Sequence, residues 1–472
     1  MTLDELCSQR VAVWGLGQEG QAMVRLLAAR GVEPLLLDDH PVAARNRLEP
    51  AVAMAVHDPG SVTWDSVDVV VRSPGVGRYR PELQAAEAAG VAVTTAMALW
   101  LEDFADAPVV AVTGTKGKST TATLAAAILR EDGLEVALIG NIGVPVTDMY
   151  GAPAADAYVV EVSSYQAADV TVSPGVCVLT SLAPDHLDWH GGVEAYYRDK
   201  LRLVEAGPPG ALAVNAASAE AVRRTAGHPG RLLFGPEGRV RVTPADRIEV
   251  DGVVVADGSH LRAPGRHNLW NLCGAVAGSL LVRGRAPSAR AVTRAVEGFD
   301  GLPSRCRTIG ERHGVTYVDD ALASNPFAAA ASVTAFAGRP LALIVGGADR
   351  GVGSGPLVDA LAARGDPATV VVIPPDPGRL VGELTGPEAA DRGPVADVRV
   401  ADDLVGAVSV ARAAVGPGGV VLFSPAAPTP DGGGGYAVRG RVFAEAAGFG
   451  PGDTGDTGDT GDAGDTGPGT DD

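Results

Sequence analysis

The sequence predicts an α/β protein with three domains, each built around a mainly parallel sheet. Three observations indicate the fold class and the number of domains. Short apolar, β-branched runs alternate with Ala- and Leu-rich segments of helical period, and this alternation stops and restarts at two places. A third observation is the length of 472 residues, which exceeds what one hydrophobic core usually supports. The predicted limits are 1–106, 107–300 and 301–449, followed by a tail at 450–472.

The first domain shows the alternation most clearly. Strands are expected at VAVW (11–14), PLLLD (34–38), VDVVV (67–71) and VAVTT (91–95). Helix-period segments, among them QAMVRLLAARG and PELQAAEAAG, separate these runs. Consecutive parallel strands need such crossover helices, so a parallel sheet is predicted.

The second domain begins where the alternation restarts at PVVAVTGTKGKST, after the loose segment FADAP. Strands are expected in DAYVVEVSS and GVCVLTSL. The stretch 239–264 has short alternating runs and turn residues, which predict a small antiparallel ribbon. A boundary is expected at GFDGLPSRCRTIG, before a third series with strands in VTYVDD, PLALIVGG, TVVVIPP, VADVRVA and GVVLFSP.

Composition restricts the functional classes. The net charge is −19, and the seven Asp of the Gly-Asp-Thr repeats after residue 452 account for part of it, leaving −12 for the rest. A negative body argues against nonspecific nucleic-acid binding, and the repeats predict a disordered acidic tail. Four scattered cysteines, the absence of a signal-like start and the absence of a long apolar run predict a cytoplasmic protein without a membrane partner, and we expect a monomer.

The first glycine motif is GLGQEG at 15–20. It follows a predicted strand and precedes a helix, the context in which backbone N–H groups meet a pyrophosphate. Asp38 ends the next strand, where an acid can bind a ribose hydroxyl. Alone, this pattern favours a nicotinamide enzyme or a purely structural turn.

The second glycine motif is GTKGKST at 114–120. Gly114 and Gly117 let the loop wrap an anion, Lys118 can contact β- and γ-phosphates, and Ser119 or Thr120 can offer a hydroxyl to Mg²⁺. Val112 stands where the full Walker pattern has its first glycine. Two phosphate loops predict two phosphorylated ligands.

The order of the motifs resembles the Mur ligase family over roughly residues 8–448. The motifs are GLGQEG, SPG (73–75), GTKGKST, GNIG (140–143), EVSSYQ (161–166), PDHLDWH (184–190), RDKLRL (198–203), GRHNLWN (265–271) and LPSRCR (302–307). The resemblance implies a Rossmann-like UDP-binding domain, a central P-loop ATPase domain with the ribbon, and a Rossmann-like C-terminal domain. It is strongest to the branch that adds glutamate to UDP-N-acetylmuramoyl-L-alanine in peptidoglycan precursor synthesis.

The resemblance also implies a mechanism in which ATP converts the substrate carboxylate to an acyl phosphate that the incoming amine displaces. Such chemistry needs charge neutralisation around phosphate oxygens more than it needs a covalent nucleophile. Lys118, His186 and Lys200 match the catalytic positions of the family. The matched Mg²⁺ positions are Ser119, Glu161, His186 and Lys200, the last if it is carbamylated.

The remaining contacts are carried over from the family's motifs. For ATP they are Gly114, Thr115, Lys116, Gly117, Lys118, Ser119, Thr120, Asn268, Asn271, Arg305 and Asp320; for the UDP-sugar they are Gly15, Gly17, Gln18, Glu19, Asp38, Ser73, Gly75, Asn141 and Ser163. Lys116 departs from the Asn that many members carry.

The amino-acid site departs further. Members that add D-glutamate typically read DSKATN where this chain has DALASN, so Leu322 replaces a lysine. The candidate glutamate contacts are Ser324, Arg350, Thr429 and Tyr436. Leucine cannot replace an ammonium group beside a dicarboxylate, so we expect the variant that adds L-glutamate.

Four alternatives remain open at this point. They are a D-glutamate-adding member, a folylpolyglutamate synthase-like ligase, an NAD-dependent oxidoreductase and a binding module without activity. The hundred residues before the P-loop argue against the synthase, and Lys118, Glu161 and His186 argue against an inactive module.

Overall fold

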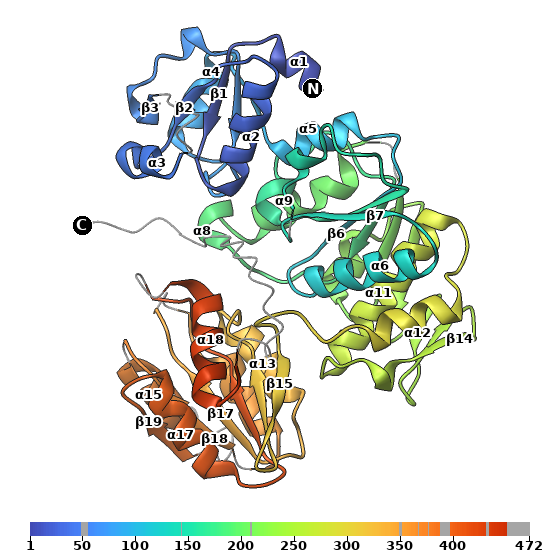
Figure 1. Cartoon of the computed structure of the whole chain (residues 1–472), viewed down its shortest axis with the longest axis vertical. Helices are drawn as coiled ribbons and strands as arrows, with labels where there is room; N and C mark the ends of the chain where they lie inside the picture. The colour runs from blue at the N-terminus through green and yellow to red at the C-terminus, as the bar shows by residue number, and fades with distance from the viewer. Residues whose placement is uncertain are drawn as a thin grey trace. The chain divides into compact units, whose positions relative to one another are not determined.

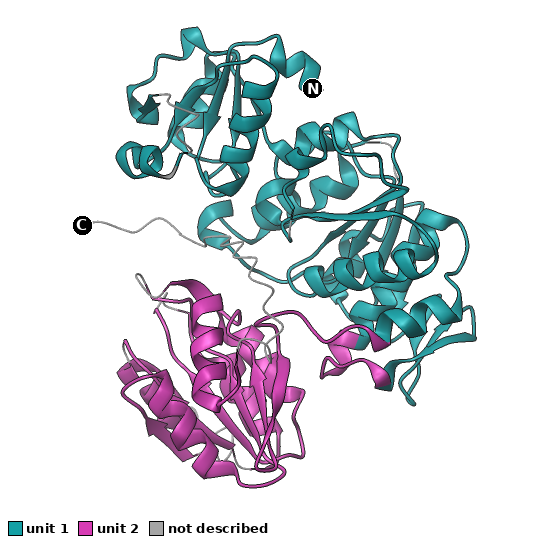
Figure 2. Ribbon diagram, in the orientation of Figure 1, with its two compact units in different colours: residues 1–259, 269–296, 463–472 teal, residues 260–268, 297–462 magenta. Residues whose placement is uncertain are grey.

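A computed structural model of the chain describes residues 1–48, 55–142, 144–207, 210–348, 352–366, 368–375, 377–387, 397–430 and 434–450. The predicted tail therefore lies outside the described residues, except Gly450. The described chain divides into two compact units (Figure 2): residues 1–259 with 269–296, and residues 260–268 with the chain from 297 onward. Three sheets carry the fold, which confirms the predicted α/β class (Figure 1). The three domain limits stay a prediction.

The N-terminal sheet of the first unit has the order β3-β2-β1-β4-β5, and all its pairs are parallel. Every predicted strand of this domain is present. The strands are β1 Val11–Trp14, β2 Leu35–Leu37, β3 Val56–His57, β4 Val69–Arg72 and β5 Ala92–Thr94; the helices are α1 Leu3–Cys7, α2 Gln18–Ala29, α3 Pro41–Arg47, α4 Pro81–Ala88 and α5 Ala96–Asp103, with single turns η1 Pro59–Ser61 and η2 Trp64–Ser66. The β1 and β4 residues are all buried, as expected where helices cover both faces.

The central sheet has nine strands in the order β14-β13-β12-β11-β10-β9-β6-β8-β7. Its strands are β6 Val109–Thr113, β7 Val136–Gly140, β8 Ala157–Glu161, β9 Val176–Leu179, β10 Ala211–Asn215, β11 Arg231–Gly235, β12 Val240–Val242, β13 Arg247–Val250 and β14 Val253–Asp257. Its helices are α6 Lys118–Glu131, α7 Ser164–Ala167, α8 Leu187–His190, α9 Val193–Glu205, α10 Ala219–Arg224, α11 Arg266–Arg283 and α12 Ala289–Glu297, with turns η3 Val146–Met149 and η4 Gly258–His260.

The predicted ribbon is confirmed, because β12, β13 and β14 pair antiparallel. It does not stand apart from the sheet, however. β12 pairs parallel with β11, and β11 pairs parallel with β10, two strands that the sequence did not predict. The ribbon therefore extends the parallel sheet at its edge.

The sheet of the second unit has the order β15-β16-β20-β17-β18-β19. Its strands are β15 Arg307–Arg312, β16 Val315–Asp319, β17 Leu341–Val345, β18 Ala368–Val372, β19 Asp397–Val400 and β20 Val420–Phe423; its helices are α13 Pro326–Thr334, α14 Gly355–Ala363, α15 Pro377–Thr385, α17 Leu404–Val415 and α18 Gly435–Ala447. All five predicted strands are present as β16 to β20, and they pair parallel.

The edge strand β15 was not among the predicted strands, and it begins within the segment where the boundary is expected. β15 pairs antiparallel with β16. His313 and Gly314 join the two strands with φ of +53° and +74°, the geometry of a tight hairpin turn. The sequence RTIGER lacks the apolar alternation of a strand, so only the pairing partner reveals it. Among all described helices, none is long and apolar enough to cross a membrane.

Candidate active site

The first glycine loop lies between β1 and α2. Gly15 has a φ of +87°, and a Cβ there would lie 2.8 Å from Val76 Cγ2. The Ser73 hydroxyl donates to the Gly15 carbonyl at 2.5 Å, so the segment after β4 holds the loop. Gly17 and Gln18 are exposed at the start of α2, and Gly75 is exposed beside Ser73. These predicted contacts therefore share one end of the N-terminal sheet.

Asp38 stabilises the same loop from the end of β2. Its carboxylate accepts hydrogen bonds from the backbone N–H of Leu16 at 2.9 Å and of His40 at 3.0 Å. Asp38 is only 8% exposed. These hydrogen bonds give Asp38 a structural role, and its expected contact with a ribose stays a prediction.

Glu19 connects the first loop to the central sheet. Its carboxylate accepts a hydrogen bond from the Gln166 amide on α7. Burial raises the pKa of Glu19 to about 7. Ser163 caps α7 by accepting a hydrogen bond from the Gln166 N–H at 3.2 Å. Glu19 and Ser163, both predicted UDP-sugar contacts, therefore belong to one hydrogen-bonded group.

The second glycine loop lies between β6 and α6, as predicted. Gly114 has a φ of +148°, and a Cβ there would lie 2.1 Å from Thr180 Oγ1. Thr180 also donates to the Lys116 carbonyl at 2.6 Å, and the Lys116 N–H donates to Ser181 Oγ at 2.9 Å. The end of β9 therefore holds the loop open at the N-terminus of α6, where a phosphate binds favourably.

Three lysines surround this loop in different environments. Lys118 donates to the Thr115 carbonyl at 3.2 Å, and Lys116, which is half exposed, lies 3.4 Å from the Asp185 carboxylate. Lys200 is buried and donates to the Gly114 carbonyl at 3.0 Å. Burial, and then the charge of Lys118, holds the pKa of Lys200 well below its ordinary value.

Two buried oxygens at this loop have no hydrogen-bond partner in the described chain. They are Ser119 Oγ and Glu161 Oε2, while Glu161 Oε1 accepts a hydrogen bond from Asn141 at 3.0 Å. Buried polar atoms are almost always paired in folded proteins, so these two oxygens are available to coordinate a ligand at the loop. Hard oxygen donors of this kind suit Mg²⁺, and thus the predicted metal residues Ser119 and Glu161 fit the ion.

Within the described residues, no group of three or more His, Cys, Asp or Glu could hold a metal ion. A Mg²⁺ ion here would therefore take its other ligands from phosphate oxygens and water, as this ion commonly does. His186 has a φ of +50° before α8, and its side chain is 41% exposed.

Asp185 is a site residue that the sequence reasoning did not single out, although it stands in the quoted motif PDHLDWH. Burial acts to raise its pKa, but Lys116, His186 and Lys118 outweigh that effect and hold the pKa below its ordinary value. The signal that could have found it is its position directly before His186.

The helix α11 reaches the second loop through Asn271. A Cβ on Gly117, whose φ is +87°, would lie 2.3 Å from Asn271 Oδ1. Asn268, one turn earlier, donates to the Pro264 carbonyl at 2.8 Å. Thr115 accepts or donates a 2.8 Å hydrogen bond with the Tyr196 hydroxyl, and Thr120 is buried in the first turn of α6.

The second unit carries the remaining predicted residues. Asp320 is buried and accepts hydrogen bonds from Cys306 N–H at 2.9 Å, Ser332 Oγ at 2.6 Å and Ser424 Oγ at 2.7 Å. Burial raises the pKa of Asp320 to about 7. These bonds occupy both of its oxygens, and its predicted nucleotide contact remains untested. Arg305 is half-buried in the segment before β15.

The predicted glutamate contacts lie in loops and helix starts of this unit. Ser324 precedes Asn325, which caps α13 by accepting from the Ala328 N–H at 2.9 Å. Thr429 follows β20, and Tyr436 is in the first turn of α18. Arg350 lies outside the described residues. The structure thus assembles the two phosphate loops in the first unit, whereas the amino-acid contacts belong to the second.

Family models match three consecutive parts of the chain. They describe a "Mur ligase MurD-like, N-terminal domain" at 9–95, a "Mur ligase middle domain" at 112–278 and a "Mur ligase, glutamate ligase domain" at 304–427. A protein of Micromonospora sp. named UDP-N-acetylmuramoyl-L-alanine--L-glutamate ligase is 41% identical over 461 residues, covering 94% of this chain and 98% of the relative. The chain belongs to the Mur ligase family. A Xanthomonas axonopodis pv. citri protein of the same name is 37% identical over 477 residues, covering 96% and 97%.

Solved structures of other proteins show the same fold. The Thermotoga maritima UDP-N-acetylmuramate-alanine ligase MurC is 17% identical, with a TM-score of 0.57 over 93% of this Mur ligase and 99% of that chain. A Mycobacterium tuberculosis folylpolyglutamate synthase complexed with ADP has a TM-score of 0.56 at 16% identity, covering 74% and 94%. The synthase therefore shares the fold over a smaller part of the chain, and family membership excludes the oxidoreductase alternative.

Proposed function

We propose that this Mur ligase joins L-glutamate to UDP-N-acetylmuramoyl-L-alanine in peptidoglycan precursor synthesis, using ATP. The observation that carries the proposal is the name shared by relatives that are 35–41% identical over nearly their full length. The sequence supports it independently. Leu322 stands where D-glutamate-adding members typically have a lysine, so the amino acid must be held differently.

The second glycine loop is the proposed ATP site. Backbone N–H groups at the start of α6 and the ammonium of Lys118 neutralise charge on the transferred phosphoryl group. The UDP-sugar carboxylate attacks the γ-phosphorus and releases ADP, and this gives an acyl phosphate. The glutamate amine then attacks the acyl carbon, loses a proton and expels phosphate, so an amide bond replaces the mixed anhydride.

Ser119 and Glu161 would hold Mg²⁺, because each offers a buried oxygen without a partner in the described chain. The ion would neutralise phosphate charge when bound. Lys200 is the proposed carbamate. A lysine whose pKa is lowered by burial spends more of its time as the neutral amine, which is the form that takes up carbon dioxide.

The first glycine loop is the proposed site of the UDP pyrophosphate. It offers backbone N–H groups at the start of α2, with Ser73 fixing the loop from the end of β4. Gln166, the partner of Ser163 on α7, donates to Glu19 of that loop, and Asn141 donates to Glu161. The glutamate contacts are proposed in the second unit, at Ser324, Arg350, Thr429 and Tyr436.

The test supplies purified full-length protein with ATP, Mg²⁺ and UDP-N-acetylmuramoyl-L-alanine, and either L- or D-glutamate. Product is identified by mass, and phosphate release gives the rate. We expect kcat/KM for L-glutamate to exceed that for D-glutamate by at least about tenfold, or 1.4 kcal/mol in transition-state binding. A preference for D-glutamate would assign the chain to the ordinary D-glutamate-adding branch. Reactions without the UDP-sugar are the control.

A further inference from the structure

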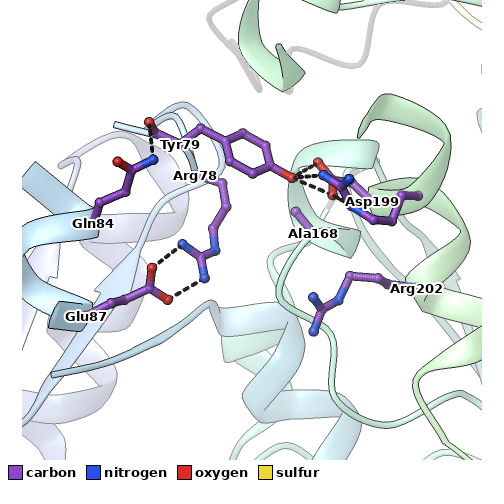
Figure 3. Close-up of a pocket in the computed structure, with 8 residues that line it drawn as sticks. Arg78, Tyr79, Gln84, Glu87, Ala168, Asp199 and Arg202 are labelled. Carbon is purple, nitrogen blue, oxygen red and sulfur yellow. Dashed lines mark hydrogen bonds and ion pairs between the residues drawn. The ribbon is translucent and has the colours of Figure 1, made fainter. Parts of the chain in front are cut away.

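A chain of four hydrogen-bonded side chains runs between the N-terminal and central sheets of the first unit. The Tyr79 hydroxyl lies 2.7 and 2.8 Å from the two Asp199 carboxylate oxygens (Figure 3). Asp199 Oδ2 lies 2.7 Å from His190 Nδ1, and His190 Nε2 lies 3.0 Å from Ser164 Oγ. None of these four residues is among the predicted ligand contacts.

The inner members of this chain are buried, whereas Tyr79 is not. The Asp199 side chain is 3% exposed, His190 and Ser164 are buried, and Tyr79 is 38% exposed beside a cavity of about 280 Å³. Burial and the Asp199 charge raise the pKa of Tyr79, so the phenol stays protonated and donates. Asp199 accepts hydrogen bonds from both Tyr79 and His190, and a buried carboxylate that loses one of its donors pays part of its desolvation penalty.

The inner end of the chain adjoins the ATP loop. Asp199 precedes Lys200 on α9, and Lys200 Nζ donates to the Gly114 carbonyl at 3.0 Å. Ser164 follows Ser163 and lies three positions after Glu161, whose Oε2 has no partner in the described chain. Asp199 and Lys200 are consecutive residues of α9, so a shift of the helix backbone at Asp199 would also move Lys200.

The outer end of the chain adjoins the first glycine loop. Tyr79 belongs to the segment 73–80, which begins at Ser73, the residue that donates to the Gly15 carbonyl. Val76 of the same segment lies against Gly15. A ligand on the first loop would immobilise this segment, and with it the Tyr79 hydroxyl.

The order Ser164–His190–Asp199 has the contacts of a nucleophilic triad, but hydrolysis is not the conclusion. Ser164 is 3% exposed, so its hydroxyl cannot reach a substrate. The more exposed member of the chain is Tyr79, which lies in the turn between β4 and α4. The geometry therefore favours a hydrogen-bonded connection between the segments next to the two loops over a second catalytic centre.

We propose that Tyr79 is a positioning residue that couples the two phosphate loops: a sugar nucleotide on the first loop holds segment 73–80, Tyr79 holds Asp199, and Lys200 is fixed against the ATP loop. The inference rests on the proposed function, because it requires a ligand on each loop. Binding at either loop then strengthens binding at the other by the same factor, as linkage requires.

Tyr79→Phe tests the coupling, and Tyr150→Phe is its matched control. Tyr150 makes the same kind of bond, to Asp103 at 2.6 Å, but Asp103 belongs to α5, whereas Asp199 and Lys200 are consecutive on α9. The dissociation constant of a nonhydrolysable ATP analogue is measured by calorimetry with and without saturating UDP-N-acetylmuramoyl-L-alanine. In the wild type and Tyr150→Phe, the UDP-sugar should tighten the analogue at least about fivefold, a typical coupling factor. In Tyr79→Phe, the two constants should agree within about twofold.

Three results separate the possible failures. Coupling retained in Tyr79→Phe would overturn the inference, and so would a wild type that binds both ligands without coupling. A wild type that binds neither ligand would instead overturn the proposed function. Asp199→Asn is a second test variant. Its amide is a weaker acceptor than the carboxylate, so the coupling should also decrease. The melting temperature of this variant checks that it folds.

Discussion

Three lysines at the ATP loop show how environment divides roles among identical side chains. Lys116 is half exposed and paired with Asp185, Lys118 contacts the loop's own backbone, and Lys200 is buried beside Gly114. An exposed ion pair contributes little because water and salt screen it. Lys118 and Lys200 therefore carry the interactions that depend on the site.

We predict that Lys118→Ala lowers ligation by about 10²–10³, because the developing charge on the transferred phosphoryl group loses its cation. The rate of phosphate release with all substrates measures the effect, and the melting temperature checks folding. Lys116→Ala in the same loop should lose less than about tenfold, since its ammonium is solvated and already paired. Equal losses in the two variants would contradict the assignment of Lys118.

At the scale of elements, α11 approaches the ATP loop at one glycine. Gly117 caps α6 with a φ of +87° and leaves room for Asn271. Neither helix shows this contact in its own periodicity. Glycine is therefore favoured at this position for two reasons. It adopts the left-handed backbone without strain, and its missing side chain allows the two helices to approach each other.

We predict that Gly117→Ala both destabilises the protein and raises KM for ATP. The left-handed backbone alone costs about 1–2 kcal/mol with a Cβ, and the contact with Asn271 adds to it. Gly133→Ala is the matched control, because Gly133 has a φ of +90° and nothing within 4 Å of its added Cβ. Denaturation midpoints and KM are compared. If the two variants behaved alike, the contact with Asn271 would have no role.

At the scale of the whole molecule, a buried ion pair joins the two sheets of the first unit. Arg72, the last residue of β4, donates from Nε to Asp169 Oδ2 at 2.7 Å, and Arg78 lies 2.6 Å from Asp169 Oδ1. Arg72 also donates to the Tyr165 carbonyl at 2.8 Å. The side chains of Arg72 and Asp169 are 0% and 4% exposed, so water cannot replace either partner.

We predict that Asp169→Ala lowers the free energy of unfolding by about 3–5 kcal/mol, since buried Arg72 loses the carboxylate to which it is hydrogen-bonded. Asp68→Ala is the control. Asp68 makes a similar paired contact with Arg10, but at the surface, where water screens the pair, so its loss should cost much less than that of Asp169. Urea denaturation of both variants measures the difference. Similar costs would show that Asp169 does not stabilise the junction of the sheets.

The sequence by itself determined the fold class and both glycine loops. Buried parallel strands read as continuous apolar runs, as in VAVW and LALIV, and glycine is required where φ is positive, as at Gly15 and Gly117. Both signals are local, so they survive in a single sequence. The strands β10, β11 and β15 carry weaker local patterns, and their assignment depends on neighbours that pair with them.

Only the tertiary structure decided which polar groups meet. Asp185, His190 and Asp199 are unremarkable as letters, but α8 and α9 bring Asp199 to Tyr79, 120 positions earlier, and Lys200 to Gly114. In the structure, the Asp38 carboxylate accepts hydrogen bonds from backbone N–H groups, and the Asp320 carboxylate accepts them from a backbone N–H and serine hydroxyls. The physical reason is that burial and hydrogen bonding depend on positions in space, whereas a motif records only residue types along the chain.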